Sequence, residues 1–193
     1  MIRSNMNESE KGKRRQFLKI GLFTALTSFL YAVPGISFGA NQNKKGICKH
    51  ADEGEVYQIR PNSFVTIKAS KRKDGIETIS LCTEEFPPGG KIPVHKHLYE
   101  DEMIFIHKGS GVLTLDNELI SVEAGSMAIV PKYSWHGLEN TGNESILMVF
   151  GYNPTGFEDF FRQVGTPKGQ EFKQLIPEER IKIAEKMGMI FKK

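Results

Sequence analysis

The stretch that decides the fold of this 193-residue chain runs from Gly89 to Gly109 and reads GGKIPVHKHLYEDEMIFIHKG. His95 and His97 are two residues apart within it. Side chains alternate across a β-strand, so both imidazoles lie on one face while Lys96 points to the other. Two imidazoles at this spacing can share one ion. The stretch therefore predicts a strand that carries part of a metal site.

A carboxylate follows the histidine pair after a short turn. Glu100, Asp101 and Glu102 compete for the place beside the imidazoles. A turn over residues 98–101 reverses the chain and returns Glu102 to the pair on the neighbouring strand, whereas the other two acids lie in the turn. The residues thus favour Glu102 and leave the other two acids open. His107 falls on the opposite face of that second strand, so we expect it to miss the ion.

A lone histidine, His136, lies farther along the chain. Three imidazoles and one carboxylate suit one divalent transition metal: Fe, Mn, Ni, Co, Cu or Zn. In a six-coordinate ion they leave two positions for water, dioxygen or a chelating substrate, whereas four ligands close a structural zinc site. Spacing alone does not establish that His136 returns to the pair.

The region from residue 56 to residue 152 predicts an all-β domain. Short β-branched and aromatic stretches alternate there with turn signals such as Asp74-Gly75 and Thr141-Gly142-Asn143. With no intervening helix, this pattern predicts an antiparallel sandwich or barrel. The strand candidates are residues 56–59, 63–69, 76–83, 91–97, 102–108, 112–116, 119–122, 126–131 and 146–152.

The C-terminal part, residues 153–193, predicts a helical extension. Phe157, Phe160, Phe161 and Val164 form one apolar helical face that ends at Gly165. Pro177 opens a second helix, which Gly188 ends. We expect both helices to pack against the barrel. The basic run at residues 71–73, before Asp74-Gly75, predicts a solvated hairpin tip.

The N-terminal residues 1–40 have the order of an export signal: a basic block ending in Arg14-Arg15-Gln16-Phe17-Leu18-Lys19, an apolar run and small residues. The block resembles the twin-arginine export signal, which predicts export to the periplasm by the twin-arginine machinery. The apolar run, residues 20–33, is shorter than the ~20 residues that span a bilayer. An uncleaved N-terminal anchor stays open. Residues 41–55 predict a linker or arm.

The leader holds six of the 26 basic and two of the 23 acidic residues, so the rest of the chain has a formal charge of −1. No basic stripe remains, which argues against a nucleic-acid partner. Cys48 and Cys82 are the only cysteines. A disulfide between them stays open, because sequence does not give their geometry. No CxxC pair indicates a thiolate zinc site.

The whole pattern resembles the two motifs of the cupins. The first motif is Gly, five residues, His-x-His, three or four residues, Glu, six residues and Gly. The second is Gly, five residues, Pro-x-Gly, two residues, His, three residues and Asn. Matching positions are Gly89, His95, His97, Glu102 and Gly109, then Gly125, Pro131, His136 and Asn140. Only Glu102 lies six residues before Gly109, so the resemblance selects it. Tyr133 replaces the inner glycine.

The resemblance implies a small antiparallel cupin barrel (a double-stranded β-helix or jelly roll) with the metal inside. Its ligands would be His95, His97, Glu102 and His136. The chain looks like single-domain cupins grouped with quercetin dioxygenases, in which the ligand glutamate removes a substrate proton; Glu102 would hold that role. A small-molecule substrate and a homodimer are also implied. The alternatives are a non-enzymatic metal- or ligand-binding cupin and a metal-assisted isomerase or lyase. Candidates to line the pocket are Phe86, Phe105, Tyr133 and Trp135.

Overall fold

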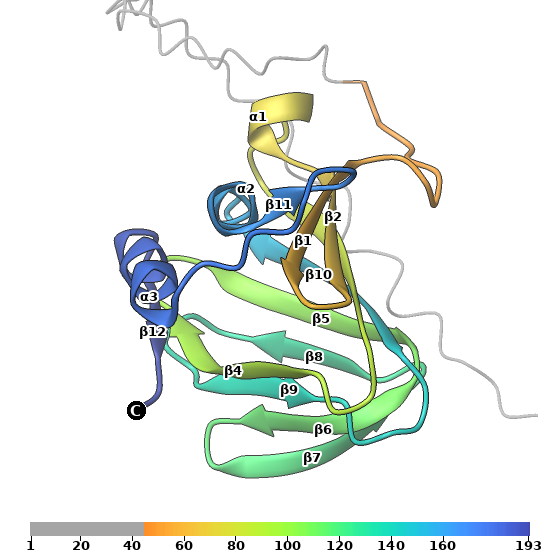
Figure 1. Cartoon of the computed structure of the whole chain (residues 1–193), viewed down its shortest axis with the longest axis vertical. Coiled ribbons are helices and arrows are strands. Elements are labelled where there is room, and N and C mark those ends of the chain that lie inside the picture. Colours follow the sequence, from red (N-terminus) through yellow and green to blue (C-terminus); the bar gives the residue numbers. More distant parts are fainter. Residues whose placement is uncertain (1–44) are drawn as a thin grey trace, which may run out of the picture. The chain divides into compact units, whose positions relative to one another are not determined.

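The computed structural model describes residues 45–193, in which two antiparallel sheets face each other (Figure 1). The larger sheet contains, in spatial order, β11 (Thr166–Pro167), β1 (Glu55–Arg60), β2 (Ser63–Ala69), β3 (Ser80–Phe86), β10 (Ile146–Asn153), β5 (Asp101–Lys108) and β8 (Met127–Val130). The smaller sheet contains β12 (Met189–Phe191), β4 (Lys91–His97), β9 (His136–Glu139), β6 (Ser110–Leu115) and β7 (Glu118–Glu123). The predicted all-β antiparallel fold is confirmed. The export signal expected over residues 1–40 lies outside the described residues.

Side-chain alternation explains why the strands pack as two layers. Along β2, Ser63, Val65, Ile67 and Ala69 are buried, while the residues between them are more exposed. Along β10, the inward side chains meet the inward side chains of both neighbours, because β10 pairs with β3 on one side and β5 on the other. Apolar side chains from the two sheets thus fill the space between them.

Three helices occur among the described residues: α1 (Lys71–Asp74), α2 (Asp159–Val164) and α3 (Pro177–Lys186). The two C-terminal helices are confirmed, and α3 begins with proline as expected. The sequence predicted a hairpin tip at residues 71–73 and no helix between the strands. Both predictions were wrong, because these residues form the single-turn helix α1. Ser70 caps it by accepting a hydrogen bond from the Lys73 amide, and Gly75 ends it with a φ of 69°. Two short strands, β11 and β12, also join the sheets from the C-terminal part.

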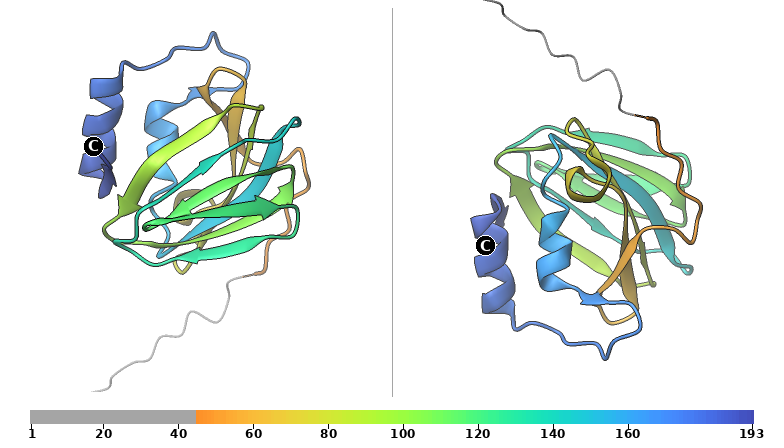
Figure 2. Two further views of the ribbon diagram at one scale, coloured as in Figure 1. Left: turned by 90° about the horizontal axis from the view of Figure 1, so that it is seen from below. Right: turned by 90° about the horizontal axis from the view of Figure 1, so that it is seen from above.

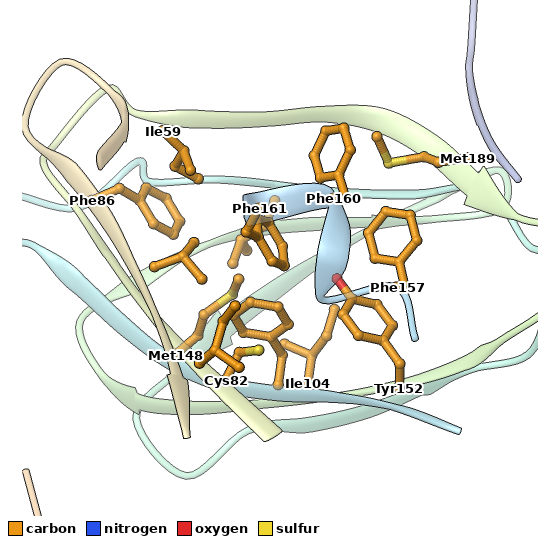
Figure 3. Close-up of a cluster of buried hydrophobic side chains, with 14 of the residues drawn as sticks. Ile59, Cys82, Phe86, Ile104, Met148, Tyr152, Phe157, Phe160, Phe161 and Met189 are labelled. Carbon is orange, nitrogen blue, oxygen red and sulfur yellow. The ribbon is translucent and has the colours of Figure 1, made fainter. Parts of the chain in front are cut away.

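The interior is rich in aromatic rings at the end of the domain where α2 lies. Figure 3 shows the rings of Phe157, Phe160 and Phe161 close to α2, with Phe157 beside Tyr152 of β10. The ring centroids of Phe157 and Tyr152 are 4.8 Å apart, and those of Phe161 and Phe150 are 5.7 Å apart. Burial of each such side chain stabilises the fold by roughly 1.5–3 kcal/mol. This packing holds α2 on the sheets.

The helices α2 and α3 lie at the same side of the domain, where they contact each other (Figure 2). The pairing of β12 with β4 joins Phe191 to His95 and Met189 to His97 in register. The C-terminal part therefore contacts the strand that carries the histidine pair. Within residues 45–193, no helix is long and apolar enough to cross a membrane.

Candidate metal centre

The strand β4 presents His95 and His97 on its inner face, where they are 6% and 2% exposed. Across the gap between the sheets, β5 presents Glu102, which is 5% exposed. Alternation along these strands accounts for all three orientations. His107, on the outer face of β5, is exposed, as the sequence predicts.

His136 reaches the pair because it begins a strand. β9 pairs with β4, and the register sets His136 directly opposite His95. No strand was expected from the sequence between residues 131 and 146, so β9 is a difference from expectation. The turn before β9 is held close by a hydrogen bond of 2.7 Å from the Tyr133 amide to the His97 carbonyl. Tyr133 has a φ of 73°, the left-handed conformation that glycine adopts without strain.

The structure brings the four side chains to one point. One nitrogen or oxygen atom from each of His95, His97, Glu102 and His136 lies within 4.8 Å of all the others. Oε2 of Glu102 lies 2.8 Å from Nε2 of His136 and 3.3 Å from Nε2 of His97. The His95 and His136 ring centroids are 4.2 Å apart. Four donors so close around one point form a cage of the size that a single ion needs.

The hydrogen-bond partners indicate what the cage is built to hold. Nδ1 of His95 donates to the Pro93 carbonyl at 2.8 Å, and Nδ1 of His136 donates to the Ser134 carbonyl at 3.2 Å. In the neutral rings these bonds place the proton on Nδ1, so each Nε2 can offer its lone pair to a cation; without an ion, Nε2 of His136 lies at hydrogen-bond distance from Glu102. Nε2 of His97 is buried without a hydrogen-bond partner among the described residues. Such an orphaned acceptor costs free energy unless a ligand satisfies it. The cluster therefore suits one divalent transition metal.

The protonation states of His95 and Glu102 agree with metal binding. Burial, together with the neighbouring imidazoles, lowers the pKa of His95 to about 3, so this ring is neutral at physiological pH. Burial alone would raise the pKa of Glu102, but hydrogen bonding to His136 and the charge of that ring outweigh it and hold the pKa below its usual range. A metal binds neutral imidazole and ionised carboxylate. The donors at these two positions are thus already in the required form.

The two competing acids have other places. Asp101 is exposed, and its carboxylate accepts a hydrogen bond of 2.9 Å from the Lys132 amide. Glu100 is buried, with 7% of its surface exposed, and lies beside His97 rather than beside Glu102. Burial raises the pKa of Glu100 to about 7. Among the three acids, only Glu102 thus joins the cluster.

A cavity of about 50 Å³ adjoins His95 and Glu102. Its aromatic wall comes from β10, from α2 and the turn before it, and from β12: Phe150, Tyr152, Phe157, Phe160, Phe161 and Phe191. The expected lining residues were wrong. Phe86 is buried in the core instead, Phe105 lies on the outer face of β5, and Tyr133 is 58% exposed. Trp135 packs under Lys96, whose Nζ lies 4.7 Å from the ring centroid on the outer face of β4.

The two cysteines are free in the structure. Cys48 is exposed in the N-terminal arm, and Cys82 is buried in β3 opposite Phe150. Burial raises the pKa of the Cys82 thiol well above its usual value, so this side chain is a small apolar residue of the core.

Comparison with known proteins identifies similar chains. The family model described as "Cupin domain" matches residues 82–152. An uncharacterized protein, MJ1618, of Methanocaldococcus jannaschii is 36% identical over 102 residues, which are 52% of this chain and 74% of that protein. The oxalate-binding protein of Thermotoga maritima is 32% identical over 62 residues, 32% of this chain and 51% of that protein.

Among solved structures, an RmlC-like cupin from Shewanella frigidimarina superposes with a TM-score of 0.51 at 16% identity. The match covers 60% of this chain and 96% of that one. At this identity the likeness shows the fold alone. Beyond MJ1618, this chain spans only about half the length of the first curated relatives that it matches.

Proposed function

The chain belongs to the cupin family, and on this premise we propose that it is an exported metal-dependent oxidoreductase of the dioxygenase type. It would add both atoms of O₂ to a small organic substrate. The observation that supports this proposal most strongly is the three-imidazole, one-carboxylate cluster beside a cavity with an aromatic wall. When bound, a divalent transition metal supplies open coordination positions and redox chemistry at this point.

The chain's own residues have separate roles in this proposal. His95, His97 and His136 would hold the ion. Glu102 accepts the proton of a substrate hydroxyl at a carboxylate oxygen, which requires that it be ionised; its lowered pKa meets that requirement. The rings of Phe157 and Phe191 line the cavity with apolar surface, which disfavours water beside Glu102.

A second function, ligand binding without turnover, is favoured by the size of the cavity. A volume of about 50 Å³ holds one or two water molecules, which is far less than a flavonol needs. Only a very small ligand fits unless the C-terminal part moves. The oxalate-binding protein of Thermotoga maritima is 32% identical to 62 residues of this chain, which makes a small carboxylate a reasonable ligand to test.

Oxygen uptake separates the two functions. Metal-loaded protein is supplied with catechols, flavonols, thiols and oxalate, and O₂ consumption is recorded beside ligand binding by calorimetry. The dioxygenase proposal expects uptake with at least one substrate, and it expects Glu102→Gln to bind metal yet lose turnover. Ligand binding without O₂ uptake across the panel would establish the second function instead.

Export is proposed from the twin arginine alone, Arg14-Arg15. We expect the protein in the periplasm, either cleaved near residue 40 or held by an uncleaved N-terminal anchor. Replacing both arginines by lysine should keep the chain in the cytoplasm, as measured by cell fractionation. Unchanged export of that variant would argue against the twin-arginine route.

A further inference from the structure

The three imidazoles differ in what holds the ring nitrogen that faces away from the cluster. For His95 and His136 this Nδ1 donates to a backbone carbonyl. For His97 it faces a carboxylate: Oε2 of Glu100 lies 3.8 Å away. That distance exceeds a normal hydrogen bond. Both atoms are buried, and neither has a hydrogen-bond partner within residues 45–193.

Two buried polar atoms without partners that face each other require a physical explanation. A buried carboxylate oxygen or ring nitrogen left unsatisfied costs about 1–3 kcal/mol. A shift of about 1 Å would turn the contact into a normal N–H···O bond and satisfy both atoms. Neither atom has to leave its buried position for this. The arrangement is therefore close to a bonded pair.

The turn that carries Glu100 is fixed from outside the site. The Leu98 amide donates to the Gly188 carbonyl at 2.8 Å. The ring of Tyr99 lies against Gly188 so closely that a Cβ there would be 2.5 Å from the ring. The C-terminal part thus holds the turn between β4 and β5, and with it the carboxylate beside His97.

We propose that Glu100 is a positioning residue for the metal, acting through His97. It accepts a hydrogen bond from Nδ1–H of His97, which fixes the tautomer whose Nε2 lone pair points into the cluster. It also offsets charge: a divalent cation with Glu102 as its only anionic ligand keeps one net positive charge in an apolar interior, and that charge favours the ionised form of Glu100 despite its burial. The proposal rests on the metal binding in the proposed function and not on dioxygenase activity.

Metal affinity tests this role directly. Co²⁺ affinity is measured by competition with a chromophoric chelator for the wild type, Glu100→Met and Glu100→Gln. Methionine removes the acceptor at similar size, whereas glutamine keeps an acceptor oxygen and loses the charge. We expect Glu100→Met to weaken binding about 10- to 100-fold and Glu100→Gln to weaken it less. Glu85→Met, the same change at an exposed position of β3, is the control and should bind like the wild type.

A second measurement separates positioning from a purely structural role. Nitrogen chemical shifts of His97 in the metal-free wild type should report a proton on Nδ1, and Glu100→Met should show a mixture of tautomers. If Glu100 only held its turn, the variant would melt at a lower temperature with unchanged Co²⁺ affinity and tautomer. Wild-type affinity in Glu100→Met, or a wild-type His97 protonated on Nε2, would overturn the proposal. The tautomer is measured without metal, so it decides even where the proposed function fails.

Discussion

Metal should stabilise this protein through all four donors of the cluster at once. Protein stripped with a chelator is melted with and without Co²⁺, followed by circular dichroism. An ion that binds only the folded state at a free concentration of 100 times Kd adds about 2.7 kcal/mol of stability. For a domain the size of the described residues, each kcal/mol raises Tm by roughly 2–4 °C. The expected rise is therefore about 5–10 °C.

His136→Ala should remove nearly all of this rise. His136 is the donor that β9 supplies, and its Nε2 lies 2.8 Å from the Glu102 carboxylate. Three remaining donors would hold the ion far more weakly. His107→Ala is the matched control, because this histidine is exposed on the outer face of β5 and should leave the rise intact. A full rise in His136→Ala would refute the assignment of this histidine to the ion.

Two further predictions concern stability. Tyr133→Gly should stabilise the fold by up to about 1 kcal/mol in urea unfolding, since a tyrosine at φ 73° is strained and 58% exposed; a loss of stability would contradict this. Burial raises the pKa of Glu84 above 4.5 despite the charge of Arg60. The Glu84 carboxyl group therefore loses its proton at a lower pH in the unfolded chain than in the folded one. As a result, the contribution of Glu84 to stability falls as the pH rises above about 4.5. Glu84→Gln should flatten that decline in urea unfolding between pH 4 and 8, whereas the exposed Glu85→Gln should not.

The shared face of His95 and His97 was predictable from sequence because alternation is a local rule, whereas His136 came from the cupin motif spacing. The spacing of His95 and His97 fixes a shared face in any strand, and the short turn between β4 and β5 returns Glu102 on the neighbouring strand. The cupin motif spacing resolved the choice among three acids, which the residues alone left open. Sequence did not identify Glu100 as the partner of His97, because that contact depends on how the turn is held.

The cavity wall was not predictable in the same way. Its rings come largely from the C-terminal part, which reaches β4 through a pairing almost one hundred residues away in sequence. No local pattern indicates which strand such a segment joins. One error was avoidable, however: Phe105 is three residues after Glu102 and so lies on the opposite face of β5.

The delivery of His136 depends on the glycine that follows it. A Cβ on Gly137 would lie 2.9 Å from the Ile92 carbonyl oxygen and 3.1 Å from the Val94 Cα, both in the backbone of β4. Because the backbones of β4 and β9 cannot shift without a large cost in free energy, any side chain at position 137 would push β9 away from β4. The pairing that sets His136 opposite His95 would then be lost or shifted. A glycine is a poor strand former, so the strand signal is weakest where the fold requires the closest approach of two strands. The close approach of β9 to β4 thus requires glycine at position 137. That glycine weakens the strand signal of β9 in the sequence and also allows His136 to join the cluster.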